Sequence, residues 1–274
     1  MLYICPTPIG NLEDITIRVI NTLKEVDYIA CEDTRHTIKL LNHYGIKNKL
    51  ISMHEHNEFI KTDSIIEDLR NGLNIAVVSD AGMPGIQDPG KILIEAAVRE
   101  KLDFTVLPGP CAFVTAAIGS GIVDEEFTFM GFVSRKSRER KAALQSHKSY
   151  RGELVFYESP HRIKDLLEDI HGVLGNRNIV LAREISKKFE SYIRLSVSEM
   201  LDYIDDNQIK GELVLIVQGN HENVEIEISD ADIEKLVIER LEADFSRKDA
   251  VKSVSRELGI SKNRVYDIAM KTEH

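Results

Sequence analysis

Short apolar runs alternate with helical stretches through the first 120 residues, and this alternation limits the possible folds more than any other feature of the sequence. The apolar runs lack a clean two-residue alternation, which is typical of strands buried on both faces, and they lie at residues 2–5, 28–31, 75–79 and 104–107. Helical spacing fills the intervals at residues 17–26, 37–44, 64–71 and 89–100. Such strand–helix alternation predicts a mostly parallel sheet covered by helices.

A second set of elements follows the stretch from Gly119 to Gly121, where we place a domain boundary. Its strands are predicted at residues 127–132, 153–157, 179–182, 192–197 and 212–217, with helices at 160–173 and 198–205. The predicted fold class is therefore α/β, with two α/β domains at residues 1–120 and 121–220.

Residues 221–274 are predicted to be an acidic linker followed by a small helical appendage. Residues 248–257 and 261–270 resemble a helix-turn-helix around the turn Leu258-Gly-Ile260, with Ser261 capping the second helix. A small core is available from Ala250, Val254, Ile260, Val265 and Ile268.

Two features of the composition bear on location and metal binding. The longest aliphatic run, residues 213–217, is far too short to span a bilayer. The three cysteines, Cys5, Cys31 and Cys111, lie far apart without a CxxC pair, so we expect neither a disulfide framework nor a zinc site. We predict a soluble cytoplasmic protein that binds no metal.

The densest cluster of glycine and proline is Ser79-Asp-Ala-Gly-Met-Pro-Gly-Ile-Gln-Asp-Pro-Gly90, directly after a predicted strand. Its second half approaches a phosphate-binding loop, but Ile92 cannot hold magnesium as Ser or Thr would, and Pro89 removes a backbone donor. Nucleotide hydrolysis is thus disfavoured. Two interpretations remain: a loop whose glycines let the backbone approach a ligand, with Asp80 as a hydrogen-bond acceptor, or a run of tight turns without a ligand.

The net charge of −10 argues against a polyanion partner until its distribution is considered. Seven basic residues and one acid fall between Ser134 and Arg151, and seven basic residues and four acids fall within residues 247–274. The first of these segments is either a solvated helix face or a phosphate-contact surface, and its position directly after a predicted strand favours phosphate contact. The candidate contact residues are Arg135, Lys136, Arg138, Arg140 and Lys141.

A series of short motifs occurs in order along the chain, namely Pro6-Thr-Pro-Ile-Gly-Asn-Leu12, Glu32-Asp-Thr-Arg35, His54-Glu-His-Asn57, Ser79-Asp-Ala-Gly82, Asp88-Pro-Gly90, Pro108-Gly-Pro110, Gly131-Phe132, Tyr157-Glu-Ser-Pro-His-Arg162, Ala182-Arg-Glu184 and Gly211-Glu212. This series resembles the tetrapyrrole methylase superfamily. Within it, the resemblance is to the bacterial enzymes that methylate a ribose 2′-hydroxyl of a cytidine in small-subunit ribosomal RNA. It runs from Pro6 to about Gly219.

The resemblance implies a homodimer and S-adenosylmethionine bound in a cleft that the second domain completes. It implies as substrate small-subunit ribosomal RNA or the assembled small subunit. The appendage is short, has a modest net charge and is attached to an enzyme, so we expect it to dock RNA instead of recognising a promoter. Matching positions imply that the cofactor contacts Gly10, Asp80, Ala81, Gly82, Pro84, Gly85, Cys111, Ala112, Phe132, Gly211 and Glu212. The chain departs from related sequences at Met83-Pro84-Gly85, often Thr-Pro and an aliphatic residue, and at Cys111, often Ser.

Methyl transfer to a hydroxyl requires alignment of the reacting atoms and removal of the hydroxyl proton. Polar clusters after predicted strands supply the candidate catalytic residues, which are Glu32, Asp33, Arg35, Glu158, His161 and Arg162. The alternative for each is helix capping with an internal ion pair, and Ser159 with Pro160 has the pattern of an N-cap and a first helical position. His54 and His56 have no further ligands at metal spacing and are interpreted as solvated or RNA-facing.

The chemical target also has alternatives. Methylation of a pyrimidine carbon usually needs an activated cysteine, and methylation of a base nitrogen favours an aromatic pocket, whereas tryptophan is absent here and aromatics are 6%. Methylation of a ribose hydroxyl requires only alignment with the methyl group and a charged or hydrogen-bonding group that helps the proton leave. Two rivals stay open: a porphyrin or corrin methyltransferase, which would not need the basic segment or the appendage, and a ligand-sensing regulator that binds DNA through residues 247–274.

Overall fold

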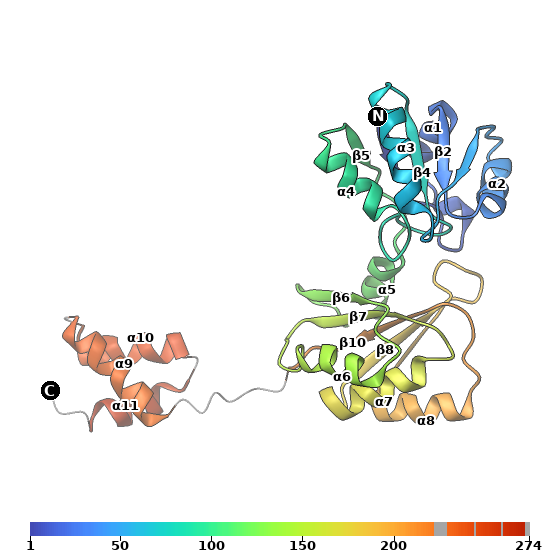
Figure 1. The fold of residues 1–274 in the computed structure, drawn as a ribbon. Helices are drawn as coiled ribbons and strands as arrows, with labels where there is room; N and C mark the ends of the chain where they lie inside the picture. The colour runs from blue at the N-terminus through green and yellow to red at the C-terminus, as the bar shows by residue number, and fades with distance from the viewer. Residues whose placement is uncertain (222–228, 244, 259, 272–274) are drawn as a thin grey trace. The chain divides into compact units, whose positions relative to one another are not determined.

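The computed structural model describes residues 1–221, 229–243, 245–258 and 260–271 (Figure 1). Residues 1–220 form one compact unit and the residues from His221 onward form a second. Among the described residues, no helix is both long enough and apolar enough to cross a bilayer.

The first sheet has five parallel strands in the order β3-β2-β4-β1-β5. They are β1 (Leu2–Ile4), β2 (Tyr28–Cys31), β3 (Leu50–Ser52), β4 (Ile75–Val78) and β5 (Phe104–Val106). In the centre of the sheet, Ile4 of β1 pairs with Val77 of β4 on one side and Val106 of β5 on the other. Because the strands are parallel, the loops that follow them emerge at the same edge, where ligands of such sheets bind.

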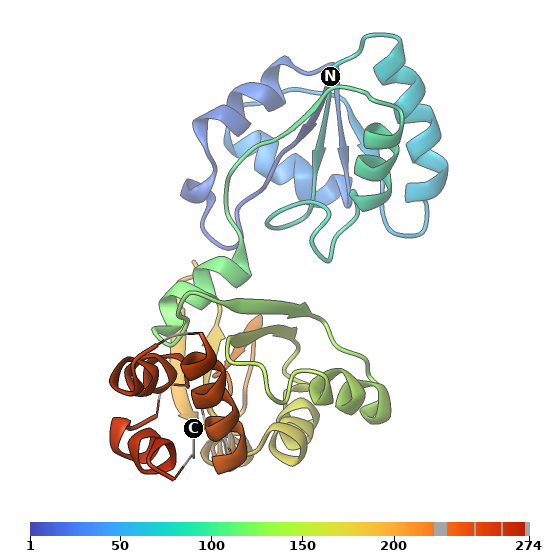
Figure 2. The ribbon, with the colours of Figure 1, turned by 90° about the vertical axis from the view of Figure 1, so that its left-hand side faces the viewer.

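Helices cover both faces of this sheet (Figure 2). They are α1 (Ile17–Glu25), α2 (Thr34–His43), α3 (Glu58–Arg70) and α4 (Lys91–Arg99), with a short 3-10 helix at Leu12–Asp14. Leu23 of α1 and Leu41 of α2 pack with Ile29 on one face. Ile65 of α3 and Leu93 of α4 pack with other strand residues on the opposite face. Burial on both faces explains why the strands are continuous apolar runs.

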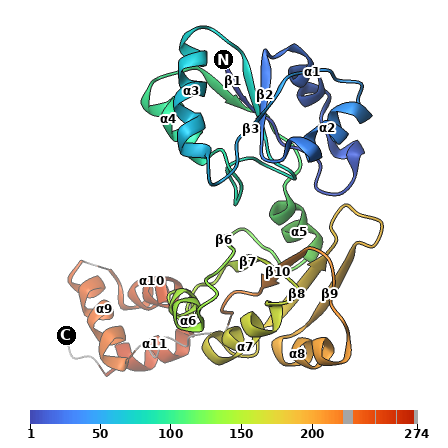
Figure 3. The ribbon, with the colours of Figure 1, turned by 45° about the vertical axis from the view of Figure 1, so that its right-hand side comes forward.

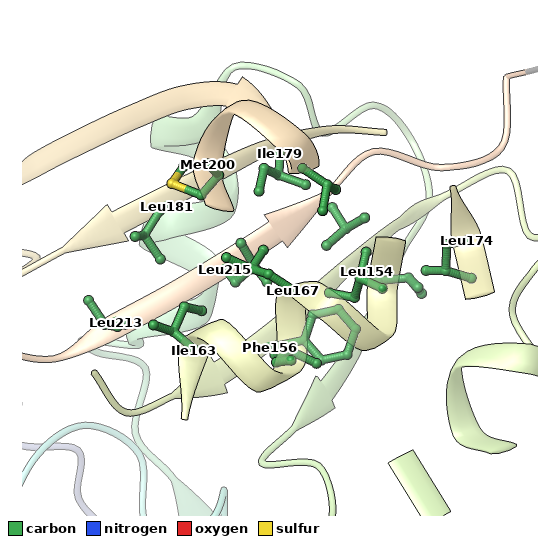
Figure 4. Packing of buried hydrophobic residues seen from close by; sticks show 14 of the residues in the cluster. Leu154, Phe156, Ile163, Leu167, Leu174, Ile179, Leu181, Met200, Leu213 and Leu215 are labelled. Carbon is green, nitrogen blue, oxygen red and sulfur yellow. The ribbon is translucent and has the colours of Figure 1, made fainter. Parts of the chain in front are cut away.

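The second sheet has the order β6-β7-β10-β8-β9, in which β6 and β7 are parallel and the other neighbours antiparallel. Its strands are β6 (Phe127–Gly131), β7 (Glu153–Glu158), β8 (Asn178–Arg183), β9 (Ser191–Ser196) and β10 (Leu213–Val217). Three helices, α6 (Ser137–Gln145), α7 (Ile163–Leu174) and α8 (Val197–Asp206), contribute to the core on one face. There Leu167 and Met200 close over Phe156 and Leu215, all fully buried (Figure 4).

Helix α5 (Ala112–Ser120) packs on the opposite face of the second sheet (Figure 3). The hydroxyl of Tyr157 accepts a hydrogen bond from the amide of Phe113 at 3.1 Å, and Arg194 donates to the carbonyls of Gly119 and Ser120 at 2.7 and 3.1 Å. The chain therefore passes between the two sheets at residues 107–111. The division of residues 1–220 into two domains stays a prediction, and this packing would put its boundary before Ala112 instead of at residue 120.

The second unit contains α9 (Asp230–Glu242), α10 (Arg247–Leu258) and α11 (Lys262–Ala269). Their shared core includes Val237, Val254 and Ile268. The hydroxyl of Ser261 accepts a hydrogen bond from the amide of Arg264 at 3.3 Å, which is the predicted N-cap. Helix α9 occupies part of the segment that was predicted to be an acidic linker. Gly259, in the predicted turn, and residues 222–228 of the linker lie outside the described residues.

The α/β fold class is confirmed, and five elements were not predicted: the 3-10 helix at Leu12–Asp14, β3, α5, α6 and α9. The predicted cap at Ser159 is wrong, because α7 begins at Ile163 with Arg162 as its N-cap. The carbonyl of Ser159 instead accepts hydrogen bonds from the amides of Arg162 and Ile163, both at 3.0 Å, in a turn before the helix.

Candidate functional site

Backbone pairing between the loops after β1 and β4 shapes the carboxyl edge of the first sheet. The amide of Thr7 donates to the carbonyl of Gly82 at 2.9 Å, and the amide of Gly82 donates back at 3.0 Å. The hydroxyl of Thr7 also donates to the carbonyl of Ser79 at 3.1 Å. Gly82 has a φ of +80°, a conformation that glycine adopts without strain. These contacts fix the start of the loop 79–90.

The other end of this loop is held by Glu58, a buried carboxylate at the start of α3. Its Oε1 accepts hydrogen bonds from the amides of Gly90 and Ile92 at 2.8 and 2.9 Å. Both amides belong to the N-terminal end of α4, where a negative charge is favourable. Sequence reasoning did not single out Glu58, because its partners lie more than thirty positions away along the chain.

A pocket of about 380 Å³ lies beside this loop. Its lining joins the loops of the first sheet with β7, β10 and the start of α5, and consists of Ile9, Ala81, Gly82, Met83, Ile86, Gln87, Asp88, Cys111, Ala112, Phe132, Tyr157, Glu158, Ser159, Pro160, Ile185, Gly211, Glu212, Leu213 and Val214. The volume falls in the range of small-molecule sites. Gln87 reaches across to β6, where a Cβ on Gly131 would collide with the Gln87 amide.

Aromatic side chains form one wall of the pocket. The ring of Tyr157 lies 4.9 Å from Phe129 and 5.6 Å from Phe132, and Phe129 stacks on Phe113 at 4.2 Å. Phe132 remains about half exposed. Because the hydroxyl of Tyr157 accepts a hydrogen bond from the amide of Phe113, its own hydrogen is available to a ligand.

Glu158 places a buried carboxylate in the same pocket. Its Oε1 accepts a hydrogen bond from the amide of Ser159 at 2.8 Å, and its Oε2 lies 3.2 Å from the guanidinium of Arg162. Arg162 also donates to the carbonyl of Val133 at 2.7 Å, so this ion pair ties the end of β7 to the segment after β6. Burial raises the pKa of Glu158, and the amide of Ser159 and the charge of Arg162 act against that rise.

A second group of carboxylates, Glu32, Asp80 and Asp88, gathers at the ends of β2 and β4. The Oδ1 of Asp80 accepts a hydrogen bond from the amide of Asp33 at 3.2 Å. Burial, followed by the charges of Glu32 and Asp80, raises the pKa of Asp88 to about 7. Burial and the charge of Asp80 also raise the pKa of Glu32. Of the three, Asp88 lines the pocket.

The structure brings seven of the proposed cofactor residues into the pocket lining: Ala81, Gly82, Cys111, Ala112, Phe132, Gly211 and Glu212. The other four lie outside the lining. Gly10 borders a neighbouring groove with Lys187 and Lys188, Asp80 holds the amide of Asp33, and the amide of Gly85 donates to the carbonyl of Pro89. Pro84 is buried within the loop. The cofactor role of all eleven stays a prediction.

Of the six candidate catalytic residues, Glu158 lines the pocket. Asp33 caps α2 by accepting from the amide of Arg35 at 2.8 Å, and it also pairs with the Arg35 guanidinium at 2.7 Å. Those hydrogen bonds lower the pKa of Asp33 to about 2. This arrangement matches the alternative of a cap with an ion pair. Glu32 is not among the lining residues and lies within electrostatic reach of Asp80, and His161 is exposed in the turn before α7.

The basic segment after Phe132 is largely helix α6, and one of its members does not face solvent. Arg140 is 4% exposed and its Nε donates to Asp169 at 2.6 Å, so its assignment to RNA contact is wrong. Arg135, Lys136, Arg138 and Lys141 are exposed, although Lys136 pairs with Glu139 at 3.0 Å and Lys141 pairs with Asp169 at 3.3 Å. Those four stay candidates for phosphate contact.

Chemically, the pocket suits a compact ligand with apolar parts and a positive charge. Apolar and aromatic side chains form much of its lining, while Asp88, Glu158 and Glu212 supply carboxylates and the lining contains no lysine or arginine. A phosphate group would therefore find no cationic partner there.

A family model and several relatives match this chain along most of its length. The family model for Tetrapyrrole (Corrin/Porphyrin) Methylases matches residues 1–201. The chain is 46% identical over 272 residues to a protein of Halalkalibacterium halodurans named ribosomal RNA small subunit methyltransferase I, covering 97% of this chain and 93% of that protein. Proteins of the same name from Bacillus subtilis and Escherichia coli O157:H7 are each 43% identical, covering 97% and 99% of this chain and 93% and 95% of theirs.

Solved structures with the same fold include diphthine synthase, with a TM-score of 0.63 at 12% identity, covering 80% of this chain and 89% of that one. A uroporphyrin-III-C-methyltransferase from Thermus thermophilus has a TM-score of 0.57 at 17% identity, covering 79% of this chain and 93% of that one. At these identities the likeness concerns the fold alone.

Proposed function

Since the chain belongs to the tetrapyrrole methylase family, we propose that it transfers a methyl group from S-adenosylmethionine to the ribose 2′-hydroxyl of a cytidine in small-subunit ribosomal RNA. The observation that carries the choice of RNA is the name shared by relatives that are 43–46% identical along almost the whole chain. In this proposal the protein acts in the cytoplasm, as a homodimer, on free RNA or on the assembled small subunit.

The pocket fits the proposed cofactor. S-adenosylmethionine carries a sulfonium, an adenosine and no phosphate, and the lining offers carboxylates, apolar surface and no basic side chain. Ala81, Gly82 and Ala112 would hold it by close backbone approach, and Phe132 and Tyr157 offer ring faces to a cation or a base. When bound, the cofactor supplies an electrophilic methyl group.

Among possible RNA targets, the lining favours the ribose hydroxyl over a pyrimidine carbon. Attack on a carbon would need a reactive thiolate, and Cys111 is the cysteine that borders the pocket. Burial raises the pKa of Cys111, which keeps it a protonated and poorly nucleophilic thiol at neutral pH. A hydroxyl needs alignment and a proton acceptor, and the pocket contains carboxylates.

The test is methyl transfer to small subunits and to free RNA, with product nucleosides identified by mass spectrometry. RNA with 2′-deoxycytidine at the target position should bind but accept no methyl group, because it lacks only the 2′-hydroxyl. Porphyrin and corrin substrates should not be methylated. A methyl group on the base, or undiminished transfer to the deoxy substrate, would contradict the proposal.

A further inference from the structure

Five groups of the pocket lining could in principle take a proton from a hydroxyl: Asp88, Cys111, Tyr157, Glu158 and Glu212. A proton acceptor must be deprotonated at working pH, and a neighbouring cation that neutralises its charge makes it a weaker base. These two requirements separate the five.

Two of the carboxylates have cationic partners. Burial raises the pKa of Glu158, but its carboxylate lies 3.2 Å from the guanidinium of Arg162 and accepts from the amide of Ser159, so it is held in an ion pair. The Oε2 of Glu212 lies 3.0 Å from the ammonium of Lys187. Tyr157 and Cys111 fail the other requirement, because burial raises the pKa of each above an already high value.

Asp88 differs from all four. It is half-buried on the loop between Gln87 and Pro89, and the charges that act on its carboxyl from neighbouring elements are both negative: Glu32 after β2 and Asp80 after β4. A hydrogen bond with Ser79 acts the other way, and the uncharged phenol of Tyr157 on β7 also lies within electrostatic reach. The resulting pKa of about 7 leaves a large fraction ionised at neutral pH while making the carboxylate a much better base than an ordinary aspartate.

From this arrangement we propose that Asp88 is the catalytic residue that accepts the proton of the ribose 2′-hydroxyl, an inference that rests on the proposed function. The hydroxyl oxygen forms a bond to the methyl carbon, and the bond between that carbon and the sulfonium sulfur breaks with its electron pair staying on sulfur. The O–H bond breaks and Asp88 takes the proton. The products are a methyl ether, a neutral thioether and a protonated carboxyl, so charge and atoms balance.

Single-turnover methyl transfer by Asp88→Asn at saturating cofactor tests this role. Its rate at saturating cofactor should fall about 100- to 10,000-fold, while the affinity for RNA stays within about threefold of wild type. The wild-type rate should rise with pH through an apparent pKa near 7, and this limb should vanish in the variant. Formate should partly restore transfer by Asp88→Gly. Full activity of Asp88→Asn, or an unchanged pH profile, would overturn the proposal.

A second measurement needs no substrate. A folded-state pKa raised from 3.8 to about 7 means that the folded protein binds more protons than the unfolded chain between these values, so stability falls as pH rises through this window. Asp88→Asn removes that loss. Relative to wild type, its melting temperature should rise between pH 4 and pH 8, whereas the exposed Asp63→Asn should show no such trend.

A difference between Asp88→Asn and wild type that does not depend on pH would contradict a raised pKa and overturn the inference. A wild-type protein that methylates no ribose refutes the proposed function itself, and that result is visible before any variant is made. The two failures are therefore distinguishable.

Discussion

The guanidinium of Arg140 is almost completely engaged inside the protein. Besides Asp169, it donates to the carbonyls of Ser134 and Asp165 at 3.3 and 3.1 Å, and Asp169 is itself buried and accepts a hydrogen bond from Ser137 at 3.0 Å. A buried charge whose hydrogen bonds are all made can be retained in a core, but the removal of one partner leaves the other charge uncompensated. Arg140 therefore joins α6 to α7.

Replacing Arg140 with Ala should lower the free energy of unfolding by at most about 3–5 kcal/mol, because Asp169 would keep a buried charge whose remaining cationic partner is the more exposed Lys141 at 3.3 Å. The matched control is Arg138→Ala, two positions away on the exposed face of the same helix, which should change stability by less than about 0.5 kcal/mol. Denaturant unfolding monitored by circular dichroism measures both. Equal effects of the two substitutions would contradict this account.

The sequence alone could not separate these two arginines. Both stand in one dense basic run, and the partner that distinguishes Arg140 lies 29 positions further along the chain. The raised pKa of Asp88 could not be predicted from the sequence for a related reason. It depends on Glu32 and Asp80, which the order of the strands brings close to Asp88. Glycines and prolines mark where a pocket forms, but not which carboxylate faces it.

At the scale of elements, the prediction succeeded where a strand was fully buried and failed where the pattern was short or uniform. β2 and β4 were recovered within one residue, because both of their faces are apolar. β3 has three residues and all are only partly buried. Helix α5 is apolar nearly all around, exposing Val114 and Ile118 while burying Ala116 and Ala117, so it lacks the polar stripe by which a helix is recognised.

Helix α6 and the residues before it present the exposed cations Arg135, Lys136, Arg138 and Lys141. Replacing all four with Ala should weaken RNA binding and lower the slope of log affinity against log salt by up to about 3, because fewer counterions are released. Cofactor affinity should stay near wild type, since none of the four lines the pocket. Fluorescence anisotropy over a salt series provides the measurement.

A quadruple Ala variant of Lys24, Lys47, Arg99 and Lys101 makes the matched control. These exposed residues lie at or just beyond the ends of α1, α2 and α4, at the edge of the first sheet opposite the strands' carboxyl ends. An equal loss of RNA affinity in both variants would show that the basic segment is a solvated helix face and not a phosphate-contact surface.

At the scale of the molecule, the pocket belongs entirely to the first compact unit. Its lining runs from Ile9 to Val214, and α9, α10 and α11 have a core of their own. Deleting residues 225–274 should therefore leave the cofactor-induced rise in melting temperature unchanged. We propose that the appendage docks RNA, and on that proposal turnover on the small subunit should fall. Thermal unfolding and methyl transfer measure the two effects separately. A lost cofactor response would show that the appendage supports the pocket.

The packing of α5 on the second sheet has a consequence for how the chain could be split into two fragments. This helix follows the first sheet in the chain, yet Tyr157 and Arg194 hold its two ends on the second sheet. A chain cut just after Gly121 would leave α5 on the first fragment, while the sheet face on which α5 packs would belong to the second fragment. Because Ala116 of α5 packs with Val155 and Val180 of the second sheet, two such fragments should reassemble when they are mixed.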